Sequence, residues 1–135
     1  MLIGRRALVA LGLPVLTQDY DFWIHGDDID VFNEAVSGLD LVPSRPMADA
    51  RSRGRYVLEN DEKVDVLVAR SVSTIDGILV AFDDVWTRRR SVDVVPGVDV
   101  SIPCLDDLIL TKKFSARPKD AEDARLLETL RGNKP

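Results

Sequence analysis

Two aspartates lie two positions apart in a segment that is otherwise mostly aromatic or aliphatic. The segment 16–24 has the sequence LTQDYDFWI and carries these acids at Asp19 and Asp21. Burying an unpartnered carboxylate there costs roughly several kcal/mol. On a strand, alternate side chains share a face, so both carboxylates would lie on one face, about 6–7 Å apart. Such a pair can converge on hard divalent cations and indicates metal-dependent phosphoryl or nucleotidyl transfer.

The composition indicates one folded domain. The chain has 135 residues, and we expect 1–135 to form a single unit. Its apolar content of 45% excludes a disordered chain. No apolar run approaches the roughly 20 residues of a membrane-spanning helix, and segment 1–9 lacks the charge order of a signal peptide. The single cysteine, Cys104, excludes an intramolecular disulfide and favours a cytoplasmic protein.

Charge and ligand chemistry narrow the choice of partners. The net charge of −5 makes the whole molecule repel nucleic acid, although a local basic surface can reverse this. One histidine and one cysteine cannot form a structural zinc site. Any metal must therefore be held by oxygen, which indicates magnesium, manganese or calcium.

The apolar periodicity predicts an α+β fold with a small mixed β-sheet flanked by helices and a helical C-terminal tail. Helices are expected over 3–11, 26–38, 103–117 and 119–130. Strands are expected over 15–24, 55–59, 63–69, 91–95 and 98–102. Residues 75–85 are expected to form a helix or a loop.

A third acid shares the unusual setting of the first pair. Asp65 lies in the run KVDVLV, where Val64, Val66 and Val68 would face one side of a strand and Asp65 the other. Three carboxylates from two neighbouring strands would form an open oxygen site. Two could bind a catalytic cation, and the third could accept the proton of an attacking hydroxyl or hold a second ion.

Taken in order, these motifs resemble a known family. The chain resembles the minimal nucleotidyltransferases of the DNA-polymerase-beta superfamily, and most closely the AbiEii-type toxin and related nucleotidyltransferases. The resemblance covers nearly the whole chain. It is carried by IG at 3–4, TxDxDF at 17–22, VDVL at 64–67, LDDLIxxK at 105–112 and ARPKDxxD at 116–123.

The resemblance implies transfer of a nucleotidyl group, AMP from ATP, to a hydroxyl of a protein, an RNA or a small molecule. It implies that Asp19, Asp21 and Asp65 are catalytic and bind Mg²⁺ or Mn²⁺. It also implies a site for the nucleoside triphosphate, formed by Gly4, Arg5, Arg6, Thr17 and Lys112.

The chain departs from the family pattern just after Gly4. Arg5 stands where the family has a small residue, and Val15 stands where it has arginine. The Arg5 side chain would either block close approach of backbone N–H groups to phosphate or supply a charge-assisted contact. A competing reading is therefore a catalytically impaired interaction module that binds a cognate toxin or antitoxin. A metallophosphatase or nuclease is a third reading, but such sites typically use histidines.

Several other patterns have structural as well as functional readings. Asp28 and Asp30 form a second D-x-D, but helical residues two apart point in different directions, which favours capping. Lys112 is either a phosphate ligand or a snorkelling side chain. The charges of 117–123 favour an ion-pair network between two helices. Arg51, Arg53 and Arg55 alternate, which on a strand would form a basic stripe on one face, and 88–90 is a second basic run. Both runs favour solvated surface, with guidance of triphosphate or RNA phosphates as the alternative.

Overall fold

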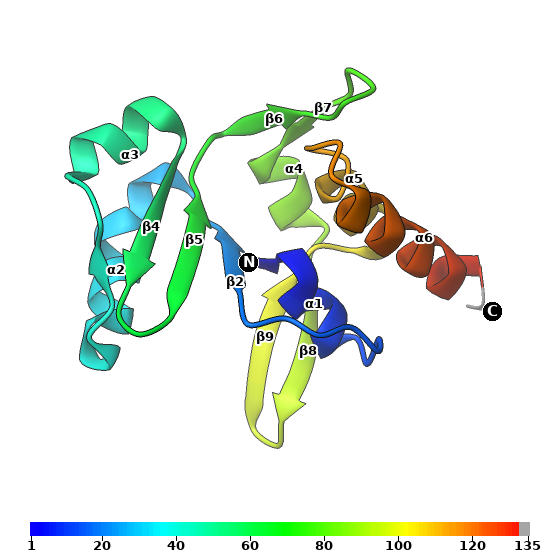
Figure 1. The fold of residues 1–135 in the computed structure, drawn as a ribbon, viewed down its shortest axis with the longest axis horizontal. Helices are drawn as coiled ribbons and strands as arrows, with labels where there is room; N and C mark the ends of the chain where they lie inside the picture. Colours follow the sequence, from blue (N-terminus) through cyan, green and yellow to red (C-terminus); the bar gives the residue numbers. More distant parts are fainter. Residues whose placement is uncertain (133–135) are drawn as a thin grey trace.

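A five-stranded mixed sheet forms one half of the molecule, in a computed structural model that describes residues 1–132 (Figure 1). Its strand order is β1-β2-β5-β4-β3. The strands are β1 (Leu2–Ile3), β2 (Tyr20–Trp23), β3 (Val42–Pro43), β4 (Arg55–Glu59) and β5 (Lys63–Leu67). Strand β2 runs parallel to β5, and the other neighbours are antiparallel. The expected α+β class with a small mixed sheet is confirmed.

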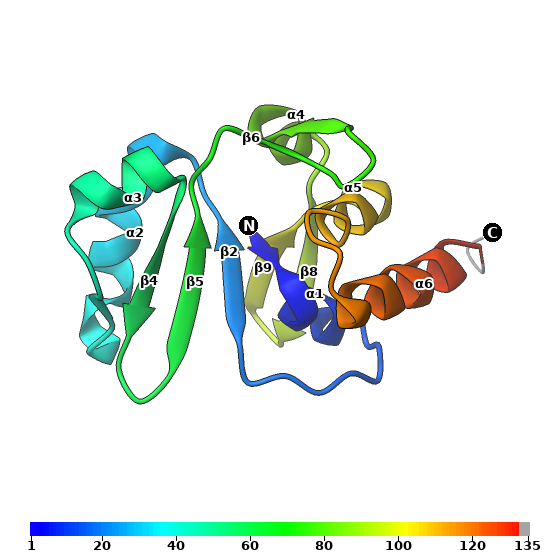
Figure 2. The same ribbon diagram turned by 45° about the horizontal axis from the view of Figure 1, so that its top comes forward.

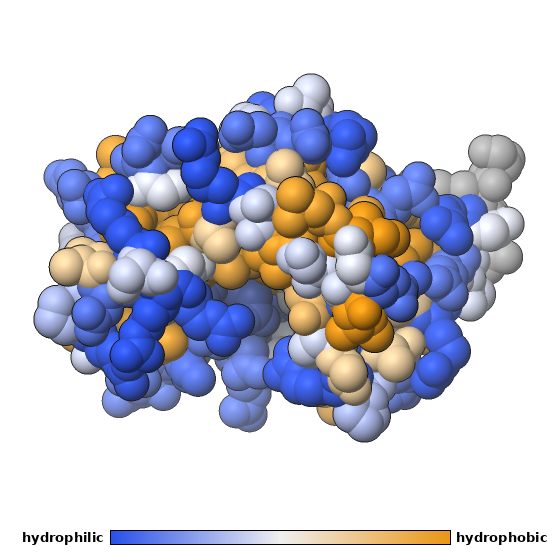
Figure 3. Space-filling view, turned by 90° about the horizontal axis from the view of Figure 1, so that it is seen from above, coloured by the Kyte–Doolittle hydropathy of each residue, from blue (hydrophilic) through white to orange (hydrophobic). Residues whose placement is uncertain are grey.

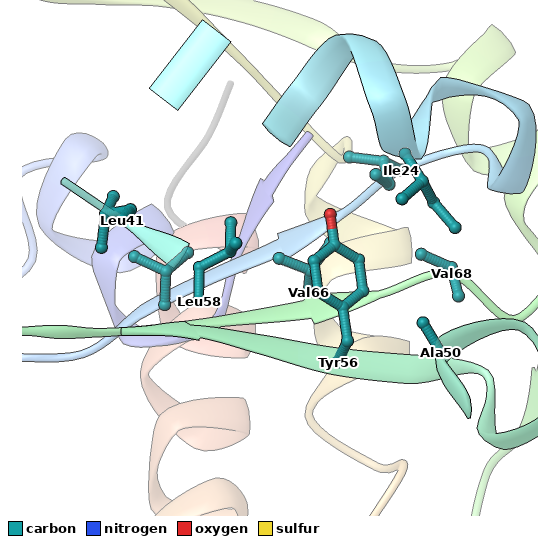
Figure 4. Close-up of a cluster of buried hydrophobic side chains, with 9 residues drawn as sticks. Ile24, Leu41, Ala50, Tyr56, Leu58, Val66 and Val68 are labelled. Atoms are coloured by element: carbon teal, nitrogen blue, oxygen red, sulfur yellow. The ribbon is translucent and has the colours of Figure 1, made fainter. Parts of the chain in front are cut away.

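One face of this sheet is covered by α2 (Ile29–Val36) and α3 (Met47–Arg53) (Figure 1). The two helices pack on the valines of β5 that alternate with Asp65, together with side chains from β4. Figure 4 shows this cluster, in which the ring of Tyr56 lies among aliphatic side chains. Its hydroxyl donates to Asn33 Oδ1 at 2.6 Å, so the one polar group at the edge of the cluster is satisfied. The opposite face of β5 carries Lys63, Asp65 and Leu67.

Within residues 1–132, the other half of the molecule is built from two hairpins and four helices (Figure 2). The hairpins are β6 (Ser71–Ser73) with β7 (Leu79–Ala81) and β8 (Arg90–Val95) with β9 (Val98–Ile102). The helices are α1 (Gly4–Ala10), α4 (Phe82–Thr87), α5 (Leu105–Thr111) and α6 (Pro118–Gly132). Short 3₁₀ turns at Gly26–Asp28 and Ser37–Leu39 flank α2.

Two further apolar clusters hold this half to the sheet. One joins α1, α5, α6 and the β8–β9 hairpin around Leu8, Leu108 and Leu127. The other surrounds Trp23, which is fully buried and whose indole N–H donates to the carbonyl of Ala69 at 2.9 Å. Because Trp23 directly follows the Asp21–Phe22 pair in β2, the strand is fixed at its end by a large buried side chain.

The strand expected over 15–24 is wrong in its first half, because regular structure begins only at Tyr20. Its partners limit its length, since β1 pairs only through Leu2 and Ile3, and β5 begins opposite Tyr20. The preceding segment is an irregular loop whose carbonyl groups accept hydrogen bonds from Arg5 and Arg6. The guanidinium groups of Arg5 and Arg6 therefore satisfy carbonyl groups that would otherwise need a neighbouring strand.

Three other expectations are corrected. Residues 75–85 do not form a continuous helix or loop, because β6 and β7 form a hairpin closed by Gly77 at φ +84° and α4 follows at once. The basic run 51–55 is not a stripe on one strand, because α3 extends to Arg53 and ends at Gly54 in the left-handed region. The helix expected over 103–117 is shorter and ends at Thr111.

Residues 1–132 contain no helix that is both long enough and apolar enough to cross a bilayer.

Candidate active site

A cavity of about 550 Å³ lies between the β2–β5 strand pair and the α5–α6 connection. Its lining includes Asp19, Asp21 and Asp65, the acids that the sequence singled out. From the described part of the chain, six basic and four acidic side chains line it, so the charge of its lining is opposite in sign to that of the whole chain. The basic side chains are Arg5, Arg55, Lys63, Lys112, Arg117 and Lys119.

Asp21 and Asp65 lie directly opposite each other on the parallel strands β2 and β5. Because neighbouring strands are about 4.8 Å apart and these residues project from the same face, their carboxylates are held close together. Burial raises the pKa of Asp21, and the negative charges of Asp65 and Asp19 raise it further. The site therefore favours a compensating positive charge.

Asp19 is placed by the loop rather than by the strand. Its backbone N–H donates to Thr17 Oγ1 at 3.0 Å, which forms a tight turn just before β2. Arg6 donates to the carbonyls of Thr17 and Asp19 at 3.2 and 3.4 Å, and its guanidinium lies 4.1 Å above the Tyr20 ring. Thr17 lines the cavity but Arg6 does not, so Arg6 is placed to fix the loop rather than to touch a ligand.

Gly4 approaches the Asp21 carboxylate too closely for any side chain. A Cβ atom at this position would lie 3.0 Å from Asp21 Cβ and would overlap Asp21 Oδ2, and the backbone has φ +68°. Close packing against Asp21 therefore requires glycine at position 4, independently of any contact with phosphate. This glycine lets the first turn of α1 pack against the central acid.

Gly4→Ala is expected to lower the free energy of unfolding by about 1–3 kcal/mol, because it adds left-handed strain to the overlap with Asp21. Urea denaturation measures the change. Gly12→Ala is the matched control, since Gly12 has φ +83° but open space around its Cβ position. Equal losses in the two variants would show that the approach to Asp21 has no energetic role.

Lys112 lies at the cavity wall but is already paired with two acids of α6. Its Nζ is 2.9 Å from Asp123 Oδ2 and 3.8 Å from Asp120 Oδ1. The side chain is only 6% exposed, and Asp123 is fully buried. Lys112 is therefore a fixed cation beside the acids, and its charge lowers the pKa of Asp21 in opposition to the larger raising effects.

Arg5 binds the same buried carboxylate. Its Nε donates to Asp123 Oδ2 at 3.0 Å, and its Nη1 donates to the carbonyl of Leu16 at 3.3 Å. This side chain thereby ties the start of α1 to α6 and to the loop that carries Asp19. Asp123 Oδ1 is buried and has no partner among the described residues. From the sequence, Arg5 was expected either to contact phosphate or to block its approach. In the structure, Arg5 also connects α1 to α6 and to the loop before β2.

Asp120 completes the network that was expected over 117–123. Its Oδ2 accepts hydrogen bonds from Ser115 at 2.6 Å and from Arg117 Nε at 2.8 Å. Burial alone would raise the pKa of Asp120, but these two hydrogen bonds and the charges of Arg117 and Lys112 outweigh it and lower the pKa. Lys119 lines the cavity without entering an ion pair among residues 1–132.

The second basic run, 88–90, does not contribute to the cavity lining. Arg88 forms two hydrogen bonds to the buried Asp107, at 2.9 and 3.0 Å, and Arg89 lies 3.8 Å above the Trp86 ring. Neither side chain lines the cavity. The structural reading of 88–90 is therefore favoured over guidance of a ligand.

The three carboxylates suit a cation whose coordination is completed by water and by the phosphate groups of a substrate. In the described part of the chain, no group of three or more His, Cys, Asp or Glu side chains is already arranged to hold a metal ion. Magnesium in phosphoryl-transfer sites is usually held by one or two carboxylates, with the remaining positions taken by water and substrate phosphate. Asp21 and Asp65, with Asp19 beside them, fit that pattern better than a closed all-protein site.

Lys63 and Phe114 are among the cavity residues that the sequence reading missed. Lys63 lies two positions before Asp65 on β5, so strand alternation alone places both on one face. Phe114 belongs to the irregular α5–α6 connection and packs edge-on against Trp23, with ring centroids 5.7 Å apart. No local signal marks Phe114, because its position depends on a long-range contact.

A scan against protein-family models finds no match for this chain, and a search of curated proteins finds no similar one. The function is therefore inferred from the side chains that line the cavity.

Proposed function

We propose that this protein is a metal-dependent nucleotidyltransferase that transfers AMP from ATP to a hydroxyl group. The observation that carries the proposal is the pairing of Asp21 with Asp65 on adjacent parallel strands, inside a cavity with an excess of basic side chains. Carboxylates and cations side by side are suited to a ligand that contains both a divalent metal and phosphate groups.

The proposed roles of the residues are based on their positions in the cavity. Mg²⁺ or Mn²⁺, when bound by Asp21 and Asp65 with Asp19, neutralises charge on the phosphate under attack. The acceptor oxygen forms a bond to the α-phosphorus, the bond to the pyrophosphate oxygen breaks, and the hydroxyl proton passes to a carboxylate. Asp65 is the better placed acceptor, because its side chain is 43% exposed and can reach an entering hydroxyl.

The side of the cavity at the start of α6 suits the pyrophosphate leaving group. Arg117 is 65% exposed although its Nε binds Asp120, and Lys119 is exposed as well. Both can turn guanidinium or ammonium donors toward a pyrophosphate without breaking the buried Lys112–Asp123 pair. Fixed positive charges at this place stabilise negative charge that develops during transfer.

We expect Mg²⁺ or Mn²⁺ together with ATP to raise the melting temperature of the protein by several degrees. Saturation to about 100 times the Kd stabilises a folded protein by about 2.7 kcal/mol. Differential scanning fluorimetry measures the shift, with sodium chloride at equal ionic strength as the control. Transfer of label from α-³²P-ATP to added acceptors tests the reaction itself. A melting temperature that is indifferent to divalent ions and ATP would contradict the proposal.

A non-enzymatic interaction module, paired with a cognate toxin or antitoxin chain, is the second candidate. The observation in its favour is an apolar band across the face that carries the β6–β7 hairpin (Figure 3). The turn of this hairpin exposes Ile75 and Ile78 to solvent, and the start of β7 exposes Leu79. This candidate expects no response to metal and ATP, and a complex that Leu79→Glu disrupts.

A further inference from the structure

The β8–β9 hairpin is longer than the part of the molecule that it packs against. At its base, Val92 and Val100 pack on the apolar cluster of α1, α5 and α6, and Ile102 is fully buried. The tip of the hairpin projects beyond α1 (Figure 1). There Val95 and Val98 are directly opposite each other and are 55% and 49% exposed. Because Val98, Val100 and Ile102 alternate onto one face of β9, this apolar face continues past the protein body into solvent.

The opposite face of the hairpin is polar and carries a pair of acids. Asp93 and Asp99 are directly opposite each other, and they are the only charged residues of segment 91–102. Both are exposed, and among residues 1–132 no basic side chain lies within ion-pair distance of either. A hydrogen bond to the Asp93 side chain and the negative charge of Asp93 raise the pKa of Asp99. Like charges directly opposite on neighbouring strands are unfavourable, so this face favours a positively charged neighbour.

The outer edge of β8 has no partner strand. Within the described part of the chain, β8 pairs only with β9, and no backbone hydrogen bond joins 90–95 to a segment outside this hairpin. A bulge between Asp93 and Val95 interrupts the ladder, so the regular part of the edge is 90–93. The unpaired N–H and C=O groups of such an edge can bind an added strand.

The charge and the alternation of this edge select the partner. Asp93 hinders pairing with a second copy of the chain, since two β8 edges would bring like charges together on molecules that each carry a net charge of −5. A strand that adds to β8 must direct successive side chains to opposite faces of the hairpin. Its side chains on the valine face would be apolar, and those beside Asp93 would be basic.

We infer that the free edge of β8 binds an extended protein segment in which basic and apolar side chains alternate. The segment adds a third strand to the β8–β9 hairpin, with its basic side chains beside Asp93 and its apolar side chains over Val95. Main-chain hydrogen bonds supply the affinity in this mode of binding, and the alternating side chains supply the specificity. No residue of 90–102 lines the cavity, so this surface is separate from the proposed transfer site.

Three fluorescein-labelled peptides of eight residues test the inference by fluorescence anisotropy. One alternates lysine with valine, the second alternates lysine with serine, and the third alternates glutamate with valine. We expect the lysine–valine peptide to bind about fivefold or more tightly than either of the others. Hydrogen–deuterium exchange at saturating lysine–valine peptide should become slower at 90–95, because the outward N–H groups of β8 gain partners.

Substitutions on the two faces separate the two kinds of contact. Asp93→Asn should weaken binding of the lysine–valine peptide by about threefold to fivefold, and Asp93→Lys should reverse the preference in favour of the glutamate–valine peptide. Val95→Thr keeps a β-branched side chain in the strand and should weaken binding by about threefold. Asp30→Asn is the matched control, because it removes an exposed charge from α2 and should leave the affinity unchanged. Circular dichroism confirms that the variants are folded.

Several results would overturn the inference. Equal weakening by Asp93→Asn and Asp30→Asn would show only a general charge effect, and equal binding of the lysine–valine and lysine–serine peptides would exclude a role for the valine face. Slower exchange outside 90–95, with none inside it, would place the peptide elsewhere. A dimer of the protein alone in sedimentation velocity, dissociated by Val95→Thr, would show that a second copy covers this face. Since these measurements contain no Mg²⁺ or ATP, their outcome is independent of the test of the proposed function.

Discussion

Replacing Asp21 with Asn is expected to abolish the proposed nucleotidyl transfer and, at the same time, to raise the melting temperature of the metal-free protein. The transfer rate should fall by about a thousandfold or more, since a lost metal ligand removes several kcal/mol of charge stabilisation. The gain in stability follows from the raised pKa of Asp21, because burial and the neighbouring acids make the ionised form unfavourable in the folded state.

The sign of the pH dependence can be stated in advance. Because the folded-state pKa of Asp21 lies above the ordinary value of 3.8, the wild-type protein loses stability as this group ionises with rising pH. The stability advantage of Asp21→Asn should therefore be largest near neutral pH. It should disappear below the ordinary value, where both folded and unfolded chains are protonated.

Asp30→Asn is the matched control for this experiment. Asp30 belongs to the second D-x-D, is exposed on α2 and does not line the cavity. Calorimetry of both variants across pH, with α-³²P-ATP transfer assays beside it, makes the comparison. A lower melting temperature for metal-free Asp21→Asn, or transfer at the wild-type rate, would show that Asp21 is not an unfavourably ionised carboxylate at the centre of a metal site.

The shared face of Asp65 and Leu67 could be predicted from the sequence, because alternation along a short apolar strand is a local property. The register that places Asp21 opposite Asp65 could not, since it depends on pairing between segments more than forty residues apart. The same limit explains the error over 15–19. The composition suits a strand, but no strand of residues 1–132 pairs with this segment.

The role of Arg5 shows the second limit of the sequence reading. The resemblance placed this side chain beside phosphate, whereas its nearest carboxylate is Asp123, 118 positions away in the chain. The charges of 117–123 did indicate an ion-pair network, and that network is present. The connection of this network to α1 could not be predicted, because it depends on packing between the N-terminal and C-terminal parts of the chain.

By contrast, the β6–β7 hairpin had a local signal that was overlooked. Asp76 and Gly77 form a turn dipeptide between two short strands, and Gly77 adopts the positive φ that such turns require. The turn is also closed by a hydrogen bond from the Ile78 N–H to Thr74 Oγ1 at 3.0 Å. The helix-like spacing of apolar residues in 75–85 belongs in part to α4, which begins only at Phe82.

Asp123→Asn is expected to be the most destabilising of the single substitutions, at about 3–5 kcal/mol in the free energy of unfolding. The change removes the shared partner of two cations, and it leaves Lys112 buried with only Asp120, 3.8 Å away. A loss of this size is a large part of the 5–15 kcal/mol or so that a domain typically has. Urea denaturation monitored by circular dichroism gives the value.

Asp106→Asn is the control, because the Arg131–Asp106 pair joins the same two helices at 2.8 Å with both side chains more than half exposed. It should cost less than about 1 kcal/mol. The double variant Lys112→Met/Asp123→Leu should recover much of the stability lost in Asp123→Asn, since an apolar pair leaves no buried charge. If Asp123→Asn is as mild as Asp106→Asn, the buried network does not hold α6 in place. The wall of the cavity that carries Lys112 must then be fixed by the apolar contacts of α5 and α6 alone.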